Sequence, residues 1–225
     1  MRRWYRFCRA VTQALFLLLF RGRVFGVRNV PLDGGVLLVC NHQSFLDPIL
    51  ATLAPPRECH YMARDTLFGN RLFRRLIESL NAFPVRRGTG DIGAIRETLR
   101  RLKHGVLVTA FPEGTRTWDG RVGAMQTGVV LIARKARVPL VPTLILGAYE
   151  VWSRQAVLPR PAPVIIAYGE PLWPDQMKEL SDEGCINVVR DRILEMMERY
   201  RGHPLVAGRL RPLPKEKRGE SSVTT

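Results

Sequence analysis

The strongest constraint on the fold is the alternation of short, continuously apolar runs with longer segments of helical periodicity. Residues 35–41 (GVLLVCN) and 106–111 (VLVTAF) have the length and composition of strands buried on both faces. Residues 91–103 instead place isoleucine and leucine three or four positions apart, which is the spacing of one helix face. This alternation predicts an α/β fold in which helices cover a mixed, largely parallel sheet.

The same two patterns predict the remaining elements. Strands are expected at 138–146 and 164–168, with a strand-like stretch at 81–88, and helices at 67–80, 126–136 and 182–200. Another helix is expected to begin with Asp47 as its cap and Pro48 at its first helical position. We assign the α/β domain to residues 25–204 and predict that the polar residues 205–225 form a disordered tail.

The N-terminus combines an apolar core with basic flanks. Residues 10–20 are an apolar stretch, but spanning a bilayer takes about 20 such residues. The sequence that follows, F-R-G-R at 20–23, is a poor signal-peptide cleavage site. Residues 1–24 are therefore predicted to form a basic amphipathic helix that lies in one leaflet at the membrane interface, and an ordinary core helix stays open as the alternative. Residues 1–30 contain seven arginines and no acidic residue, which favours an anionic membrane surface.

The overall charge is consistent with an anionic partner but does not identify it. The chain has 35 basic and 20 acidic residues, a formal net charge of +15. Nucleic acid, an anionic membrane or a phosphate-bearing substrate would each suit this excess. The four cysteines have neither CxxC pairing nor metal-ligand spacing, so they indicate a reducing compartment and predict no metal site.

The first motif that carries chemistry is N-H-Q-S-F-L-D at residues 41–47. If His42 lies in a loop and Asp47 at a helix start, the chain can fold back and bring the carboxylate to the imidazole. Asp47 would then fix the tautomer of His42, whose other nitrogen could take a proton from an alcohol. The alternative is that both residues serve only local turn and cap roles. Ser44 is not surrounded by a G-x-S-x-G elbow and is assigned a turn role.

Two further motifs supply cationic groups. In F-P-E-G-T-R at 111–116, Arg116 offers a planar fork that matches phosphate oxygens, and Glu113 could bind a glycerol hydroxyl or hold Arg116 in place. The stretch N-A-F-P-V-R-R-G at 81–88 ends in two arginines, for which a solvated charge pair is the alternative. A fourth segment, V-P-L-V-P at 138–142, indicates little beyond a buried strand.

Together and in this order, the four segments resemble the 1-acylglycerol-3-phosphate acyltransferase family and its glycerolipid acyltransferase relatives. The family pattern N-H-x-S-x-x-D is present at 41–47 and F-P-E-G-T-R at 111–116, and the resemblance extends over about residues 25–170. Two positions depart from the family pattern: Arg64 stands where a lysine is common, and Asn81 replaces the glycine that usually opens the block at 81–88.

The resemblance implies a role for each matched residue. His42 would be the general base and Asp47 its orienting partner. The residues that would hold the glycerophosphate head are Glu113, Gly114, Thr115, Arg116, Arg87 and Arg64. The implied partners are a lysophospholipid acceptor, acyl-CoA or acyl carrier protein as thioester donor, and an anionic membrane surface. No cofactor is implied, and the active site would lie on the cytoplasmic face of the membrane.

Other function classes are weighed against this one. A thioesterase or other lipid-directed hydrolase could use the same His–Asp pair to activate water, but the arginines favour an acceptor with a phosphate head. Transfer to another lysolipid is also open. A basic non-enzymatic module that binds membrane or nucleic acid ranks last, because the aromatic residues are scattered and match no nucleic-acid-binding motif, so no nucleic-acid partner is expected.

Overall fold

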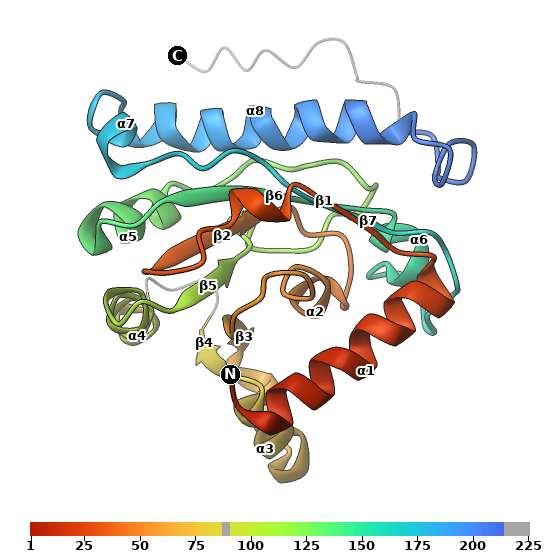
Figure 1. Cartoon of the computed structure of the whole chain (residues 1–225), viewed down its shortest axis with the longest axis horizontal. Coiled ribbons are helices and arrows are strands. Elements are labelled where there is room, and N and C mark those ends of the chain that lie inside the picture. Colours follow the sequence, from red (N-terminus) through yellow and green to blue (C-terminus); the bar gives the residue numbers. More distant parts are fainter. Residues whose placement is uncertain (87–90, 214–225) are drawn as a thin grey trace, which may run out of the picture.

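Seven strands form one sheet that carries helices on both faces (Figure 1). The computed structural model describes residues 1–86 and 91–213. The strand order is β1-β7-β6-β2-β5-β3-β4, and every neighbouring pair is parallel except β6 and β7. The strands are β1 (Arg23–Phe25), β2 (Val36–Cys40), β3 (Cys59–Arg64), β4 (Ala82–Val85), β5 (Leu107–Ala110), β6 (Leu140–Leu146) and β7 (Ile165–Tyr168). The predicted mixed, largely parallel sheet is confirmed.

The central strand β2 shows why the sequence of a parallel strand is continuously apolar. Leu37 and Val39 pack into the core on one face of the sheet, whereas Val36, Leu38 and Cys40 pack into the core on the other. All five side chains are fully buried. Because helices cover both faces, neither face tolerates the polar residues that alternate along a half-exposed strand.

The helices divide between the two faces of the sheet. The first core contains side chains of α4 (Ile92–Lys103), α5 (Gly128–Ala136), α7 (Pro174–Lys178) and α8 (Asp182–Arg201). The second contains side chains of α1 (Arg3–Phe20), α2 (Asp47–Leu50) and α6 (Ala148–Trp152). The remaining helical elements are η1 (Val27–Asn29), η2 (Asp65–Phe68) and α3 (Arg71–Ser79). Along the chain, η2 and α3 connect β3 to the edge strand β4.

Several boundaries differ from the sequence prediction. Strands β1 and β3 and helices α6 and α7 were not predicted, because each is short or carries mixed polarity. The N-terminal helix ends at Phe20, and residues 23–25 already belong to the sheet, so the predicted boundary at residue 24 falls within β1. The predicted disordered tail is wrong for residues 205–213: Val206 is fully buried, and Leu213 packs against the same core. Residues 214–225 lie outside the described residues.

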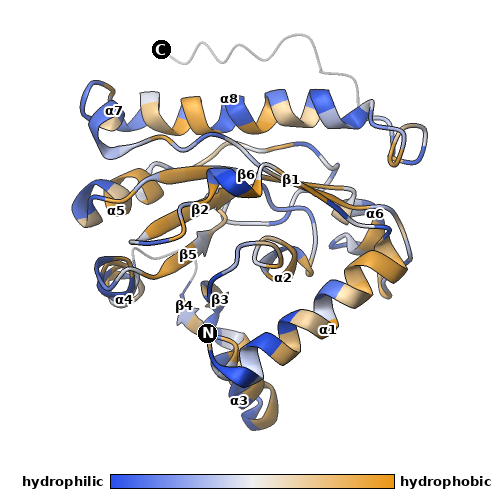
Figure 2. Ribbon diagram, in the orientation of Figure 1, coloured by the Kyte–Doolittle hydropathy of each residue, from blue (hydrophilic) through white to orange (hydrophobic). Residues whose placement is uncertain are grey.

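Helix α1 leaves many of its apolar side chains exposed. Its buried residues are Tyr5 and Phe16, and two polar side chains on the inward side bond to backbone carbonyls: Arg9 to Pro55 at 2.6 Å and Gln13 to Leu53 at 2.7 Å. The outward side is apolar, and its exposed side chains include Trp4, Phe7, Val11, Leu15 and Leu18. Figure 2 shows the C-terminal half of α1 as predominantly apolar. This pattern is the reverse of a surface helix in water.

Candidate active site

The two motifs predicted to carry chemistry meet at one edge of the sheet. Strands β2 and β5 are parallel neighbours, with Val39 paired to Ala110. The loops that follow them, residues 41–46 and 111–116, therefore leave the same edge side by side. A direct contact joins the loops, because the backbone N–H of Thr117 donates to the His42 carbonyl at 2.8 Å.

His42 and Asp47 form a buried pair. The His42 Nδ1 and Asp47 Oδ2 atoms are 2.8 Å apart, and the two side chains are 6% and 0% exposed. The same Oδ2 accepts the backbone N–H groups of Gln43 at 2.5 Å and Ser44 at 2.7 Å. The loop thus folds back on Asp47, whose carboxylate makes no cap bond to α2, so the predicted cap role is wrong. Oriented in this way, Asp47 holds the Nδ1–H tautomer of the imidazole.

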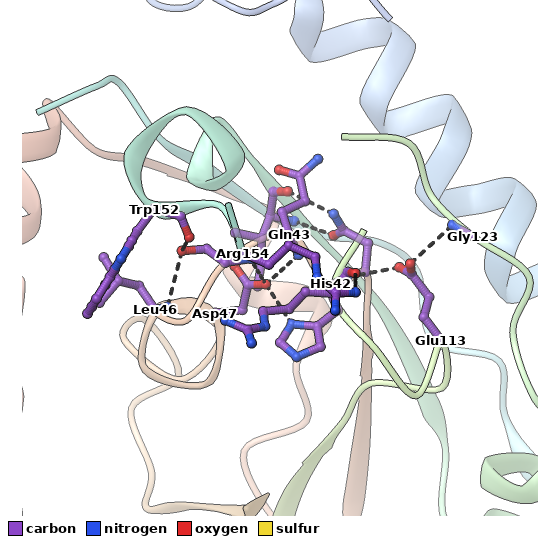
Figure 3. Close-up of polar contacts among 12 residues, drawn as sticks. His42, Gln43, Leu46, Asp47, Glu113, Gly123, Trp152 and Arg154 are labelled. Atoms are coloured by element: carbon purple, nitrogen blue, oxygen red, sulfur yellow. Dashed lines mark hydrogen bonds and ion pairs between the residues drawn. The ribbon is translucent and has the colours of Figure 1, made fainter. Parts of the chain in front are cut away.

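Neighbouring polar side chains fix this loop to the sheet. Asn41 extends the β2–β6 ladder with its amide, which donates to the Ile145 carbonyl at 2.9 Å and accepts the Ile145 N–H at 2.7 Å. Ser44 Oγ donates to the Trp152 carbonyl at 2.9 Å and accepts the Leu46 N–H at 3.2 Å (Figure 3). The geometry of Ser44 is that of a turn residue, as the sequence indicates.

Glu113 joins the two loops. Its Oε1 accepts the His42 N–H at 2.9 Å and its Oε2 accepts the Gly123 N–H at 3.1 Å, as Figure 3 shows. Burial raises the pKa of Glu113 to about 7, although the two N–H donors act in the opposite direction. With each carboxylate oxygen bonded to a backbone donor, Glu113 is placed to position His42. The sequence prediction offered a glycerol hydroxyl or Arg116 as its partner and did not identify this role.

The second motif ends in an exposed turn and one cationic side chain, Arg116. Gly114 has a φ of +70°, a conformation in which other residues are strained, and this turn presents the exposed Thr115 hydroxyl. The guanidinium carbon of Arg116 lies 3.4 Å from the centre of the Phe45 ring. The aromatic ring holds the guanidinium near the loop that carries His42.

Sequence reasoning missed a second cation beside this motif, Arg154, which follows α6. Its Nη1 donates to Thr115 Oγ1 at 3.2 Å and to the Arg116 carbonyl at 3.3 Å. Its guanidinium carbon lies 3.5 Å from the centre of the Trp118 ring. No motif surrounds Arg154 in the sequence, and only the fold brings it to this edge.

The remaining predicted site residues belong to the neighbouring strands. Arg64 is the last residue of β3, so it stands at the same edge of the sheet as the two loops. Arg87 lies outside the described residues. Asn81 opens its block with a φ of +72°, a conformation that asparagine tolerates better than most residues. The family's preference for glycine there has a backbone reason, and asparagine satisfies it.

A groove of about 590 Å³ opens beside the second motif. Glu113, Gly114 and Thr115 are among the residues that line it. Its walls are mainly apolar and come from β3, α4, β5 and α5, including Met62, Ile95, Thr98, Phe111, Val129 and Ile132. The site therefore combines a polar, cationic edge with an adjoining apolar groove.

The family model described as Acyltransferase matches residues 21–146 of this chain, a span that includes both motifs. The chain belongs to this acyltransferase family. A similar protein is the 1-acyl-sn-glycerol-3-phosphate acyltransferase of Bacillus subtilis (strain 168), which is 32% identical over 75% of this chain and 82% of its own length. The enzyme of the same name from Streptococcus pneumoniae is 30% identical over 74% of this chain and 61% of its own length.

A solved structure and a plant enzyme are also similar to this acyltransferase. The crystal structure of the 1-acyl-sn-glycerophosphate (LPA) acyltransferase PlsC from Thermotoga maritima matches with a TM-score of 0.77 and 28% identity, over 88% of this chain and 80% of that one. The relative of the same activity from Cocos nucifera is 30% identical over 64% of this chain and 47% of its own length. The acyltransferase thus spans about half the length of this plant relative.

Proposed function

We propose that this acyltransferase moves a fatty-acyl group from an acyl thioester to the free hydroxyl of 1-acylglycerol-3-phosphate, giving phosphatidate for phospholipid biosynthesis. The observation that carries the proposal is the buried His42–Asp47 pair at the edge where the loop 111–116 places Arg116 against Phe45. The names of the relatives from Bacillus and Streptococcus support the same acceptor. The donor is acyl-CoA or acyl carrier protein, and the reaction requires no other cofactor.

In the proposed reaction the acceptor hydroxyl attacks the thioester carbonyl directly. His42 takes the hydroxyl proton at Nε2, and Asp47 stabilises the imidazolium that forms. The tetrahedral intermediate then collapses with cleavage of the C–S bond, and the imidazolium returns its proton to the departing thiolate. No acyl-enzyme is needed: the Ser44 hydroxyl donates to the Trp152 carbonyl, and burial raises the pKa of the Cys40 thiol well above its usual value.

The cationic edge is the proposed site of the glycerophosphate head. Arg154 bonds to Thr115 Oγ1 and to the Arg116 carbonyl, and both arginines carry planar donor groups suited to phosphate oxygens. Arg64 would approach from the end of β3, and the assignment of Arg87 rests on the family motif alone. Gly114 and Thr115 supply the turn on which the head would rest, and Glu113 acts through His42.

The apolar groove between α4 and α5 is the proposed location of an acyl chain. Residues of the second motif line part of the groove, and the proposed chain would have its carboxyl end at that part, toward the catalytic edge. The walls offer Met62, Ile95 and Val129, which suit hydrocarbon.

The proposed location is the cytoplasmic face of a membrane, with α1 in the interface. Within residues 1–86 and 91–213, no helix combines the length and hydrophobicity that crossing a bilayer requires. The outward apolar side of α1 and the arginines near its start, Arg3 and Arg6, fit a helix that lies along the lipid surface. That location would place the site where the lysolipid acceptor resides.

The test is an assay of the purified chain in detergent with labelled acyl-CoA, with and without 1-acylglycerol-3-phosphate. We expect labelled phosphatidate that depends on the acceptor, and a loss of about 10²–10⁴-fold or more in His42→Ala with a preserved fold. Free fatty acid as the sole labelled product would establish the hydrolase alternative. Substantial transfer by His42→Ala would contradict the base assignment.

A further inference from the structure

Helix α3 carries an apolar side that the protein covers only in part. Ile77 is buried at 8% exposure, whereas Leu72, Phe73 and Leu76 are 78%, 43% and 45% exposed. All four side chains lie within a nine-residue helix. A helix on a protein surface in water normally turns such residues inward. The partial cover indicates that α3 contacts something apolar outside the chain.

The polar side of α3 is strongly basic. Arg71, Arg74 and Arg75 are exposed, and Glu78 is the acidic residue of the helix. Arg74 pairs with Glu78 at 2.8 Å, which leaves a net positive charge on the helix. Exposed leucine and phenylalanine beside arginine is the composition of a helix that rests on anionic lipid. An apolar groove on a partner protein would cover the leucine and phenylalanine side chains of α3 but would not account for its exposed arginines.

Helix α3 also adjoins α1, the proposed membrane-interface helix. The Trp4 Nε1 group donates to Ser79 Oγ at 3.0 Å, and Arg2 donates to the Ser79 carbonyl at 3.1 Å. Figure 1 shows the start of α1 beside α3, at the end of the molecule away from α8. Trp4 is itself 49% exposed and stacks on Phe7 with 5.9 Å between ring centroids. The outward apolar side chains of the two helices therefore belong to adjacent surfaces.

We propose that α3 is a second membrane-contact helix and that it binds an anionic bilayer together with α1. This inference rests on the proposed function, because it assumes that the acceptor is drawn from a lipid surface. A single interfacial helix leaves the protein free to roll about the axis of that helix. Contact through α3, which is joined to α1 at Ser79, removes that freedom. The two helices together hold the catalytic edge at a fixed orientation above the lipid.

The experiment is co-sedimentation of the full chain with vesicles of phosphatidylcholine, alone or mixed with phosphatidylglycerol. Leu72→Glu and Leu76→Glu are expected to lower partitioning about tenfold or more on both vesicles, because each places a charge at an apolar contact. Arg75→Gln is expected to lower it about fivefold on the anionic vesicles only. Leu131→Glu in α5 is the matched control, since Leu131 is 47% exposed against 45% for Leu76, and it should bind as the wild type does.

The outcome is separable from that of the proposed function. Acyl transfer measured in detergent micelles should be unchanged in Leu72→Glu, Leu76→Glu and Arg75→Gln, which also shows that these variants fold. Wild-type vesicle binding by Leu72→Glu, Leu76→Glu and Arg75→Gln would overturn the role of α3 while leaving the enzymatic proposal intact. Absence of transfer by the wild type would instead refute the proposed function, and the vesicle comparison would still decide whether α3 contacts lipid.

Discussion

Replacement of Asp47 by asparagine tests the proposed catalytic pair most directly. In the wild type, Oδ2 accepts all three hydrogen bonds from His42, Gln43 and Ser44, whereas Oδ1 is buried and has no hydrogen-bond partner among the described residues. An asparagine can place its carbonyl oxygen at the Oδ2 position and keep all three bonds. The substitution then removes the negative charge and leaves the loop geometry in place.

The magnitude follows from the distances. An imidazolium and a carboxylate whose charges are about 4 Å apart interact by about 4 kcal/mol at an effective dielectric constant of about 20. Losing that stabilisation of the protonated His42 corresponds to a decrease of about 10³-fold in kcat. The NH₂ group of the asparagine would occupy the buried Oδ1 position, where its two N–H donors find no acceptor among the described residues. This lowers the free energy of unfolding by about 1–3 kcal/mol.

The assay is acyl transfer with the acceptor concentration varied, alongside urea unfolding of the same protein in detergent. We expect Asp47→Asn to lower kcat with little change in the KM for the acceptor. The control is Ser44→Ala, which removes bonds to Trp152 and Leu46 but leaves the Asp47 carboxylate intact, and should lose much less activity. A wild-type kcat in a folded Asp47→Asn enzyme would refute the electrostatic role assigned to this carboxylate.

Four further substitutions test other parts of the site. Arg116→Gln and Arg154→Gln should each raise the KM for 1-acylglycerol-3-phosphate by about tenfold, consistent with loss of one charge-assisted bond of about 1.5–3 kcal/mol; an unchanged KM would contradict the phosphate role. Because burial raises the pKa of Glu113 to about 7, its protonated form favours the folded state, and this contribution is lost as pH rises from about 4.5 to 7. The stability advantage of wild type over Glu113→Gln should therefore fall by about 1–3 kcal/mol between pH 5 and pH 8 in urea unfolding, and a pH-independent difference would contradict this. Asn41→Leu should cost about 2–3 kcal/mol, because it leaves both polar groups of Ile145 without their partner, and near wild-type stability would contradict that role.

The parts of the fold that the sequence predicts are those with uniform local patterns. Strand β2 is apolar throughout because it is buried on both faces, and α4 is capped by Asp91, whose side chain accepts the Ala94 N–H at 3.0 Å. The strand β3 contains histidine and arginine and has only three consecutive apolar residues, so its place between β4 and β5 depends on tertiary pairing.

The same distinction applies to the site. The spacing of His42 and Asp47 allows their contact, since a loop of four intervening residues can return a carboxylate to an imidazole, and the resemblance to the family motif is what implies it. The role of Glu113 could not be predicted, because its partners are backbone N–H groups at residues 42 and 123, and backbone groups leave no sequence pattern. Arg154 escaped prediction for a related reason: its contacts with Thr115 and the Arg116 carbonyl span almost forty residues of sequence.

The backbone of His42 is shared by both catalytic loops, since its N–H bonds to Glu113 and its carbonyl to Thr117. The two motifs therefore form one structural unit. In a chimera that takes only residues 41–47 from a relative, the backbone of this segment would face a partner loop of different sequence. Exchanges that move residues 41–47 and 111–123 together should preserve turnover, which makes this pair of segments the natural unit for grafting activity between members of the family.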